Sequence, residues 1–443
     1  MPAGDDPPER ALSSSRALGA PDADGSSVKA LSWSAFVSTY LPALILALGT
    51  GIALPAIPTL ARSFHVSFAL ATGVTTSFLL GNVFGTLPSG WLVDRVGRRK
   101  VMLYGPLLTS AMAFLVATAH TFPELLVYRF FDGCAAQMWL IGRLAGISHG
   151  AAADQRGKQV SWMFGMNNTG KLTGPVIGGF IAGAWGVRAP FITYGFLALV
   201  ALVPAFKFTP DTPRQSRAAG SSPSPPKLSL RAIVRPRLVY FGVALFAGLA
   251  RGPVQADLLH LYAAYAYRLG PEQIGFLATG ASIISLPIGF LAGWMMDRFG
   301  RKRTMVPGFS GATIAMAGLA IASLLHLSLT AYVLIFYFVI ATQSLTGGSI
   351  QTIGADVAPP EARGRFLGLW RFAGQSGIAA SPVIFAFLSA AAGYSVAFLF
   401  ISLSASVVAG LLIFKVPETG QIRDRKTVVS SETDTPASVA PKE

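Results

Sequence analysis

Long apolar stretches recur along the whole chain and are separated by short polar segments. About 20 apolar residues are enough to cross ~30 Å of hydrocarbon as a helix. Membrane β-strands are excluded, because they are only ~10 residues long and alternate in polarity. The pattern predicts an all-α integral membrane protein with twelve transmembrane helices, at about 33–58, 68–93, 101–120, 123–146, 158–184, 189–207, 237–262, 272–296, 304–325, 330–352, 364–390 and 394–416.

The composition supports this interpretation. Of the 443 residues, 52% are hydrophobic and only 12% are charged, and the mean hydropathy is +0.55. Soluble proteins carry about 25% charged residues. The single cysteine, Cys134, lies within a predicted helix, which excludes an intrachain disulfide and a thiolate metal cluster. The five histidines are scattered without metal-ligand spacing, so we expect neither a metal nor a cofactor.

The net charge of +15 is unevenly distributed. If residues 1–32 are cytoplasmic, the predicted outer loops carry only Arg62, Arg188 and Arg268, whereas the segment 207–237 alone carries seven basic residues. An excess of Lys and Arg in cytoplasmic loops is the positive-inside bias of membrane proteins. It predicts a multi-pass protein of the plasma membrane, or of the inner membrane in a bacterium, with both termini cytoplasmic. Nucleic acid is thereby excluded as a partner.

Three polar segments divide the chain. Residues 1–32 are acidic, contain Ser and Pro, and lack the basic start and apolar core of a signal peptide, so they predict a disordered cytoplasmic tail. Residues 208–236 are rich in Pro, Ser and Arg and predict a cytoplasmic linker, and 417–443 predict a second cytoplasmic tail. The remaining segments, 33–207 and 237–416, are then two six-helix bundles.

Two internal repeats relate the bundles to each other. The sequence GWLVDRVGRRK at 90–100 returns 203 positions later as GWMMDRFGRKR. A second pair aligns Arg156, Gly170 and Pro175 with residues 207 positions further on. Such repeats indicate the duplication of a six-span unit, so we expect the two six-helix bundles to be pseudo-symmetric.

These motifs resemble those of the major facilitator superfamily over essentially all of residues 33–416. The segment 90–100 is similar to that family's loop between the second and third helices, and Arg129 with Gly133 matches its Arg-x-x-x-Gly motif. GKLTGPVIGG at 170–179 is similar to the Gly-Pro motif of its proton-driven exporters, and GTGIALPAIPTLA at 49–61 resembles its drug-exporter branch. The resemblance implies a secondary active transporter that works by alternating access, and not an enzyme.

Each repeated hairpin combines a turn glycine, an aspartate and several basic residues. Glycine permits a tight turn, and the basic side chains suit a membrane surface with anionic lipid. The aspartate can face the positive N-terminal end of a helix in the other bundle, although a simple topogenic charge cluster is the alternative. The resemblance implies an inner gate that contains Gly90, Asp94, Arg95, Gly97, Arg98, Gly293, Asp297 and Arg298.

The fifth predicted helix carries Asn167, Lys171, Gly174 and Pro175 on one stripe. Its glycines permit close helix packing, whereas the resemblance implies that Gly174 and Pro175 belong to the gating machinery. An ammonium group inside a membrane costs at least ~2.5–3.5 kcal/mol. We therefore expect Lys171 to face a water-filled cavity and, with Asn167, to bind substrate.

Asp132 and Asp257 are the two carboxylates placed well inside predicted helices. Apolar surroundings favour the neutral form of a carboxyl group, which reversible proton binding requires. We expect one of the two to carry a proton. Asp132 follows Arg129 by three residues, so it forms either a permanent ion pair or a pair that opens during transport.

The seventh predicted helix is interrupted by Pro253 and places Arg251 and Gln255 on one face. Interrupted helices build the central sites of transporters, so both residues are substrate candidates. Arg371 in the eleventh helix is equally open to a structural role and to substrate contact.

Together these features predict proton-coupled efflux of a small organic solute or drug, by a monomer in contact with membrane lipid. The charges placed inside the predicted helices are mostly positive, namely Arg129, Lys171, Arg251 and Arg371. They favour an anionic or zwitterionic solute, so a proton-coupled symporter that takes up an organic anion is the alternative. A membrane enzyme lacks support because no Ser-His-Asp set, metal cluster or phosphate loop occurs at the right depth. A nutrient sensor built on a transporter fold would need a substantial signalling tail, whereas the predicted tails are short.

Overall fold

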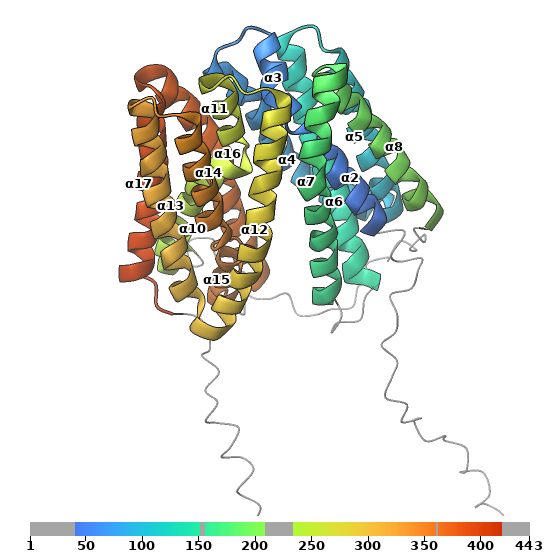
Figure 1. The fold of residues 1–443 in the computed structure, drawn as a ribbon. Coiled ribbons are helices and arrows are strands. Elements are labelled where there is room, and N and C mark those ends of the chain that lie inside the picture. Colours follow the sequence, from blue (N-terminus) through green and yellow to red (C-terminus); the bar gives the residue numbers. More distant parts are fainter. Residues whose placement is uncertain (1–39, 151–155, 209–233, 360–361, 419–443) are drawn as a thin grey trace, which may run out of the picture.

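The computed structural model describes residues 40–150, 156–208, 234–359 and 362–418. The predicted N-terminal tail, residues 33–39 of the first predicted helix, most of the predicted linker and residues 419–443 of the predicted C-terminal tail lie outside these residues. Within them the chain forms long helices packed side by side (Figure 1). The first half contains α2 (Leu41–Ala53), α3 (Ala56–Ser63), α4 (Phe68–Val96), α5 (Arg98–Thr118), α6 (Phe122–Gly150), α7 (Arg156–Trp185) and α8 (Ala189–Phe208). The second half contains α10 (Leu238–Gln255), α11 (Leu258–Ala266), α12 (Pro271–Phe299), α13 (Arg301–Leu324), α14 (Leu329–Ser344), α15 (Ser349–Val357), α16 (Arg363–Ala392) and α17 (Tyr394–Phe414).

These helices make twelve membrane-spanning units, as the hydrophobic pattern predicts. In the described part of the chain, nine spans are long and apolar enough to cross a membrane, and the pair α2 and α3, bent by 43°, makes a tenth. The other two units are α6 and α7, which have 29 and 30 residues. They are long enough to span the bilayer. Their lower hydropathy reflects the charged, amide and hydroxyl side chains discussed below.

Three of the twelve predicted helices are broken. The first breaks at Leu54 and Pro55, where proline lacks the N–H that would continue the helix. The seventh continues through Pro253, contrary to the prediction that proline interrupts it, and breaks at Asp257, whose φ of 52° is left-handed. The tenth breaks between α14 and α15, at 345–348.

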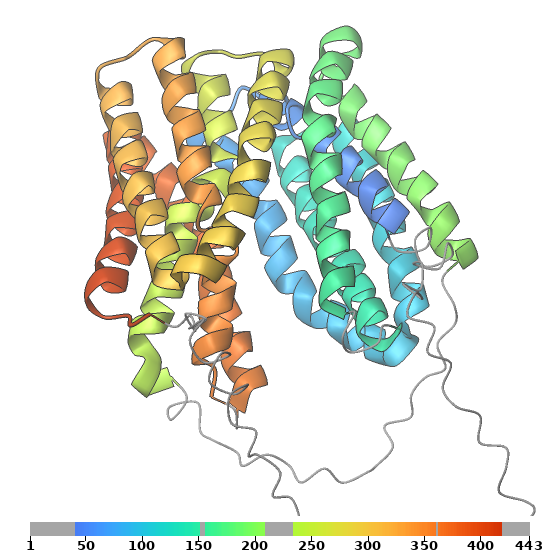
Figure 2. The ribbon, with the colours of Figure 1, turned by 60° about the horizontal axis from the view of Figure 1, so that its bottom comes forward.

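The two halves share one packing scheme, and Figure 2 shows them side by side. In the first half α4 and α5 pack on α6, and α2 packs on α7 and α8. In the second half α10 packs on α16 and α17, and α13 on α14 and α17. Because each helix of one half has a counterpart with the same neighbours, the bundles are pseudo-symmetric.

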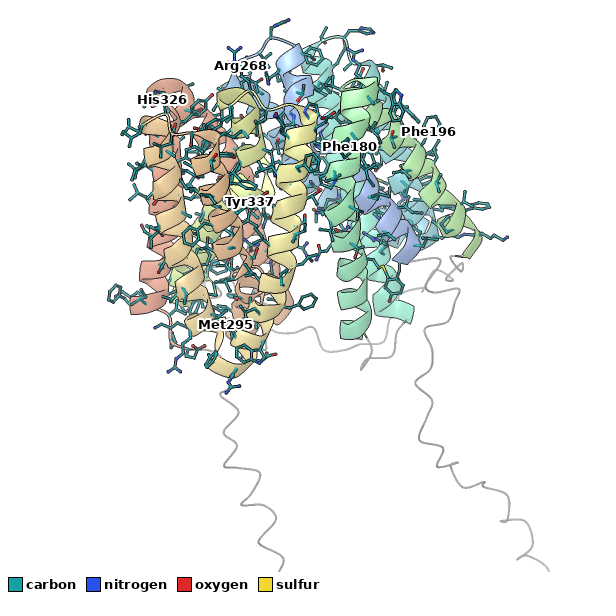
Figure 3. The ribbon with its side chains drawn as sticks, viewed as in Figure 1. Phe180, Phe196, Arg268, Met295, His326 and Tyr337 are labelled. Carbon is teal, nitrogen blue, oxygen red and sulfur yellow. The ribbon has the colours of Figure 1, made fainter. Side chains whose placement is uncertain are left out.

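The repeated hairpins lie at one end of both bundles. Gly97 separates α4 from α5 and Gly300 separates α12 from α13, with φ of 89° and 96°. Only glycine adopts such angles without strain. We call this end of the molecule the hairpin end. Figure 3 shows Met295 of α12 near it, and Arg268 and His326 in loops at the opposite end.

Each hairpin is fastened to the last helix of its own half. In the first, Arg99 Nη2 donates to the carbonyl oxygen of Phe206 over 3.1 Å. In the second, Lys302 Nζ donates to the carbonyl oxygen of Ile413 over 2.9 Å. The Glu418 carboxylate also accepts from the backbone N–H of Lys302 over 3.1 Å, where a negative charge stabilises the start of α13.

Helix α7 packs against α2 with its backbone. At Gly174, an added Cβ would lie 2.7 Å from the Cα of Gly51, and at Gly178 it would lie 2.0 Å from the carbonyl oxygen of Ile52. Small residues of this kind allow membrane helices to approach closely. The glycines of α7 are therefore required for packing.

Gly178→Ala should destabilise the protein, because overpacking of a close contact costs about 1–3 kcal/mol. We expect a lower thermal unfolding midpoint in detergent. Gly165→Ala is the matched control on the same helix, since an added Cβ there meets nothing within 4 Å. Equal midpoints for the two variants would contradict the packing role.

Candidate functional site

The two halves are joined at the end opposite the hairpins. Arg62 of α3 donates to the carbonyl oxygen of Ala264 in α11 over 2.9 Å. The Tyr265 hydroxyl donates to the carbonyl oxygen of Val66 over 3.2 Å. These bonds cross from one half to the other, so they tie the two bundles together at this end.

Aromatic rings add to the same junction. The ring of Phe68, at the start of α4, lies 5.6 Å from Tyr265, 5.9 Å from Phe385 and 4.9 Å from Tyr394, measured between ring centroids. The three partners belong to the second half. The pairs with Tyr265 and Tyr394 are edge-to-face, and such pairs each contribute ~0.5–1.5 kcal/mol, which makes Phe68 a central contact of this closed end.

Helices α7 and α12 continue the junction toward the middle of the molecule. A Cβ added at Gly275 would lie 2.4 Å from the carbonyl oxygen of Pro175, so the two backbones touch. Thr279 Oγ1 donates to the carbonyl oxygen of Leu172 over 3.3 Å. Beyond this point, toward the hairpin end, a cavity opens between the two helices.

This interhelical cavity has a volume of about 350 Å³. Its lining combines one ammonium group, one amide and two hydroxyls with apolar side chains, and it includes no carboxylate. The lining residues are Asn168 and Lys171 of α7, and Ser282, Ser285, Leu286, Gly289 and Phe290 of α12.

Lys171 is the one residue of this lining that was predicted to bind substrate. Its side chain is exposed in the cavity, and among the described residues no carboxylate lies within ion-pair distance. Asn167 is half-buried and is not part of the lining, whereas its neighbour Asn168 is. Ser282 and Ser285 were not predicted as site residues. Their spacing of three and four residues with Gly289 already places all three on one face of α12.

Arg129 and Asp132 form a buried ion pair inside the first half. Arg129 Nη1 lies 2.5 Å from Asp132 Oδ2, and both side chains are buried. The guanidinium also lies over the ring of Phe78, 4.5 Å from its centroid. Asp132 Oδ1 and Arg129 Nε make no hydrogen bond in the described structure. Both residues of the pair belong to α6 and are buried inside the first half. Neither residue lines the interhelical cavity.

Asp257 lies at the break between α10 and α11. Its Oδ1 is 3.6 Å from His260 Nδ1, and 34% of the Asp257 side chain is exposed, against 9% for His260. The left-handed backbone turns this carboxylate toward the histidine of the following helix. Asp257 is therefore the more accessible of the two candidate carboxylates.

The remaining predicted substrate residues are spread over the second half. Arg251 is largely buried, and its Nη1 donates to the carbonyl oxygen of Gly347 over 3.4 Å, at the break between α14 and α15. Gln255 and Arg371 are exposed on α10 and α16. Arg251 thus stabilises a broken helix, and the structure does not gather these three residues with Lys171 in the cavity lining.

The predicted gate residues of the two hairpins lie in open surroundings at the hairpin end, unlike Gly174 and Pro175, which are tightly packed in α7. Arg95 lies over the ring of Trp91 at 4.9 Å, and Arg298 repeats this contact with Trp294 at 5.4 Å. These cation–π pairs give the repeated tryptophan a role that sequence reasoning missed. Gly90 and Gly293 have nothing within 4 Å of an added Cβ, and Asp297 is exposed. The side chains of Asp94 and Arg98 lie outside the described part of the structure.

No group of three or more potential metal ligands occurs within the residues that the structure covers.

Comparison with known proteins agrees with this architecture. The model of the Major Facilitator Superfamily matches residues 39–381 and 257–441. Quinolone resistance protein NorA of Staphylococcus aureus (strain MRSA252) is 25% identical over 252 residues, which are 55% of this chain and 62% of NorA. The chain thus matches less than two thirds of NorA's length. Multidrug resistance protein 2 of Bacillus subtilis (strain 168) is 23% identical over 307 residues, 68% of this chain and 76% of that protein.

Solved structures with the same fold include a D-xylose-proton symporter, with a TM-score of 0.71 and 19% identity over 87% of this chain and 98% of that one. A bacterial homologue of the human lysosomal transporter Spinster, in an inward-facing conformation, has a TM-score of 0.62 and 15% identity over 84% of this chain and 94% of that one. At these identities the likeness concerns the fold. Together with the family match over most of its length, it shows that this chain belongs to the major facilitator superfamily of membrane transporters.

Proposed function

We propose that this protein exports a small organic solute across the plasma membrane by alternating access, driven by protons that move in the opposite direction. The observation that carries the proposal is the interhelical cavity around Lys171. It lies where the two halves separate, and both halves contribute to its lining. In this proposal a single chain is the transporting unit, since α7 and α12 of the same chain line the cavity.

The positive-inside bias supports a cytoplasmic position of the hairpin end in this proposal. The junction of Phe68, Arg62 and Tyr265 then closes the outer side, and the cavity between α7 and α12 opens toward the cytoplasm. This is the arrangement of an inward-facing transporter ready to take up its cargo from the cell. An outward-facing state requires the outer junction to part and the hairpins to approach the other half.

The lining of the cavity suits an anionic or zwitterionic group. Lys171 supplies a positive charge, and the Asn168 amide supplies hydrogen-bond donors. The hydroxyls of Ser282 and Ser285 donate to carbonyl oxygens of α12 over 3.2 Å, so they offer acceptor oxygens to a solute. Phe290 and Leu286 offer apolar surface for the rest of the solute. A solute that contacts Lys171 on α7 and the serines on α12 bridges the halves, and this differential contact can shift the balance between conformations.

Asp257 is the proposed proton carrier. A carrier must exchange its proton with water, and the Asp257 side chain is partly exposed at a helix break. Asp132 is buried and paired with Arg129, so its role in this proposal is structural. One proton that moves down ~100 mV and one pH unit releases roughly 2.3 plus 1.4 kcal/mol, enough for a ~500-fold gradient of a neutral solute.

The relatives support export, since NorA and multidrug resistance protein 2 are named for resistance. Uptake of an organic anion together with protons is the second candidate, favoured by a cavity lining without a carboxylate. The fold serves both directions, because a D-xylose-proton symporter shares it.

Direction is tested in proteoliposomes with an imposed pH gradient and a panel of cationic, neutral and anionic solutes. We expect the transported solute to move against the proton flow, and anions or zwitterions to be preferred. Accumulation in the direction of proton flow would support the symporter instead.

Lys171→Gln should weaken binding of an anionic solute. Loss of a hydrogen bond to a charged group costs about 1.5–3 kcal/mol, so we expect KM to rise roughly 10- to 100-fold. Lys415→Gln removes the same charge from an exposed position after α17 and should leave KM unchanged. An unchanged KM for every anionic solute in Lys171→Gln would contradict a substrate role.

Asp257→Asn should abolish proton-driven transport and retain solute counterflow, because the amide cannot carry a proton. Proton-driven transport that persists in Asp257→Asn would rule out the carrier assignment.

Asp132→Asn leaves a buried Arg129 without its ionic partner, so it should lower the free energy of unfolding by about 3–5 kcal/mol, seen as a lower unfolding midpoint.

A further inference from the structure

A buried histidine lies beside the carboxylate of Asp257. His260 belongs to the first turn of α11, and its side chain is 9% exposed. Its Nδ1 lies 3.6 Å from Asp257 Oδ1, and its ring meets that of Phe336 edge-to-face, with 5.4 Å between the ring centroids. Neither ring nitrogen has a hydrogen-bond partner among the residues that the structure describes. Buried polar groups are ordinarily hydrogen-bonded, so this imidazole requires an explanation.

The carboxylate of Asp257 is likewise not used where its position would predict. Asp257 directly precedes α11, and an aspartate at that position ordinarily accepts a hydrogen bond from a backbone N–H of the first helical turn. Asp257 makes no such bond, and its φ of 52° is left-handed. Its acceptor oxygens therefore remain available to the imidazole of His260.

The helices around α11 bring no other carboxylate to this histidine. Away from the hairpin end, α4 carries no titratable residue, and those on the other helices in contact with α11 are Arg62 of α3, Arg251 of α10, Glu272 of α12, Tyr332 and Tyr337 of α14, and Tyr394 of α17. Arg62 and Tyr332 donate to backbone carbonyl oxygens of α11, and Arg251 donates to that of Gly347. Within the described part of the chain, Asp257 is the one carboxylate at ion-pair distance from His260.

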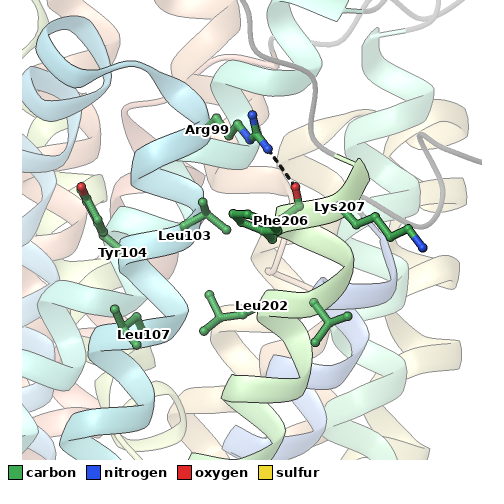
Figure 4. A pocket seen from close by; sticks show the side chains of 8 residues that line it. Arg99, Leu103, Tyr104, Leu107, Leu202, Phe206 and Lys207 are labelled. Atoms are coloured by element: carbon green, nitrogen blue, oxygen red, sulfur yellow. Dashed lines mark hydrogen bonds between the residues drawn. The ribbon is translucent and has the colours of Figure 1, made fainter.

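A second cavity offers no comparable site. It has a volume of about 760 Å³ and lies between α5 and α8 in the first half (Figure 4). Arg99 donates to the carbonyl oxygen of Phe206 beside it. The described lining residues of this cavity include neither a carboxylate nor an imidazole, and these are the side chains that exchange protons near or below neutral pH.

Carboxylate and imidazole supply different properties to a proton site. A carboxyl group in water binds its proton near pH ~4, whereas an imidazole does so near pH ~6.5. The Asp257 side chain is 34% exposed, which allows it to exchange protons with water. The buried ring of His260 adds a base that works near neutral pH. Together they combine access to water with proton binding in the physiological range.

We propose that Asp257 and His260 bind one proton as a pair, and that this is the proton that drives transport. The pairing rests on the proposed function, in which Asp257 is the proton carrier. In the loaded pair the proton lies between Oδ1 and Nδ1, and an imidazolium beside a carboxylate carries no net charge. When the proton leaves to water through Asp257, a neutral imidazole and a carboxylate remain. The two atoms must approach by about 0.5 Å to reach an ordinary hydrogen-bond length.

Helix α11 connects this pair to the outer junction. The helix has nine residues, and the pair lies at its start. Near its other end, the carbonyl oxygen of Ala264 accepts from Arg62 of the first half. The next residue, Tyr265, donates to the carbonyl oxygen of Val66. A change in the net charge of the pair therefore acts on the same short helix that holds the two bundles together.

The test is ¹⁵N NMR of the full chain in detergent, with its five histidines labelled in the ring. His260→Asn identifies the His260 signals by their loss. From about pH 5 to about pH 8, the range in which imidazoles titrate, we expect the His260 ring of the wild type to gain a proton. Asp257→Asn should displace this transition to more acidic pH by about one pH unit or more, because the carboxylate no longer stabilises the imidazolium.

Two features keep this test decisive. Asparagine tolerates a left-handed backbone as aspartate does, so Asp257→Asn retains the helix break. Asp297→Asn makes the same change at an exposed position of the hairpin end and should leave the His260 transition where it is. A His260 ring that gains no proton in the wild type would overturn the pair without any variant, and so would equal transitions in the wild type and Asp257→Asn.

Proton-driven transport of Asp257→Asn in proteoliposomes separates the pairing from the transport role. Loss of this transport together with a displaced His260 transition supports both. Loss of transport without displacement makes Asp257 the carrier alone and overturns the pair. Persistent transport with a displaced transition establishes the shared proton, but it rejects the carrier assignment of the proposed function and the role of the pair in transport.

Discussion

The backbone of a chain in hydrocarbon must satisfy its own hydrogen bonds, and the rest of this structure depends on that constraint. It requires long helices and permits breaks only where other parts of the protein supply partners. At the break after α10, Ala256 N–H still donates to the carbonyl oxygen of Gly252 over 2.7 Å. Nearby, the Gln343 side chain donates to the carbonyl oxygen of Ala250 and the Tyr332 hydroxyl to that of Leu259. The same break presents Asp257 in a left-handed conformation.

Helix α7 combines scaffold and site because its faces meet different partners. Gly174 and Gly178 contact the backbone of α2, which belongs to the same half. Pro175 meets Gly275 of α12, which belongs to the other half. Lys171 lies just beyond this second contact and lines the cavity. A change in the angle between α7 and α12 would therefore alter the cavity directly, and such rocking of one bundle against the other is the motion that transporters with internal repeats use.

The two halves repeat the contacts of their hairpins, but they do not repeat Lys171 of the candidate site. Both hairpins turn at a glycine with positive φ, and both place an arginine over a tryptophan. The second basic residue after each turn contacts the last helix of its half. By contrast, the position 207 residues after Lys171 is Ile378. The repeated contacts are shared by the two bundles, whereas the charge that we propose to recognise a solute, Lys171, has no counterpart in the second half.

The sequence by itself determined the twelve spans, the duplicated hairpins and the need of Lys171 for a polar environment, because these follow from local hydropathy and from the cost of burying charge. Helical periodicity assigns a residue to a face of its own helix, but it does not say which helix lies opposite. Only the tertiary structure decided that Asn168, and not Asn167, lines the cavity with Ser282 and Ser285, that Arg251 bonds at a helix break, and that Asp132 lies inside one bundle. Those outcomes depend on how the helices pack, which is a non-local property of the chain.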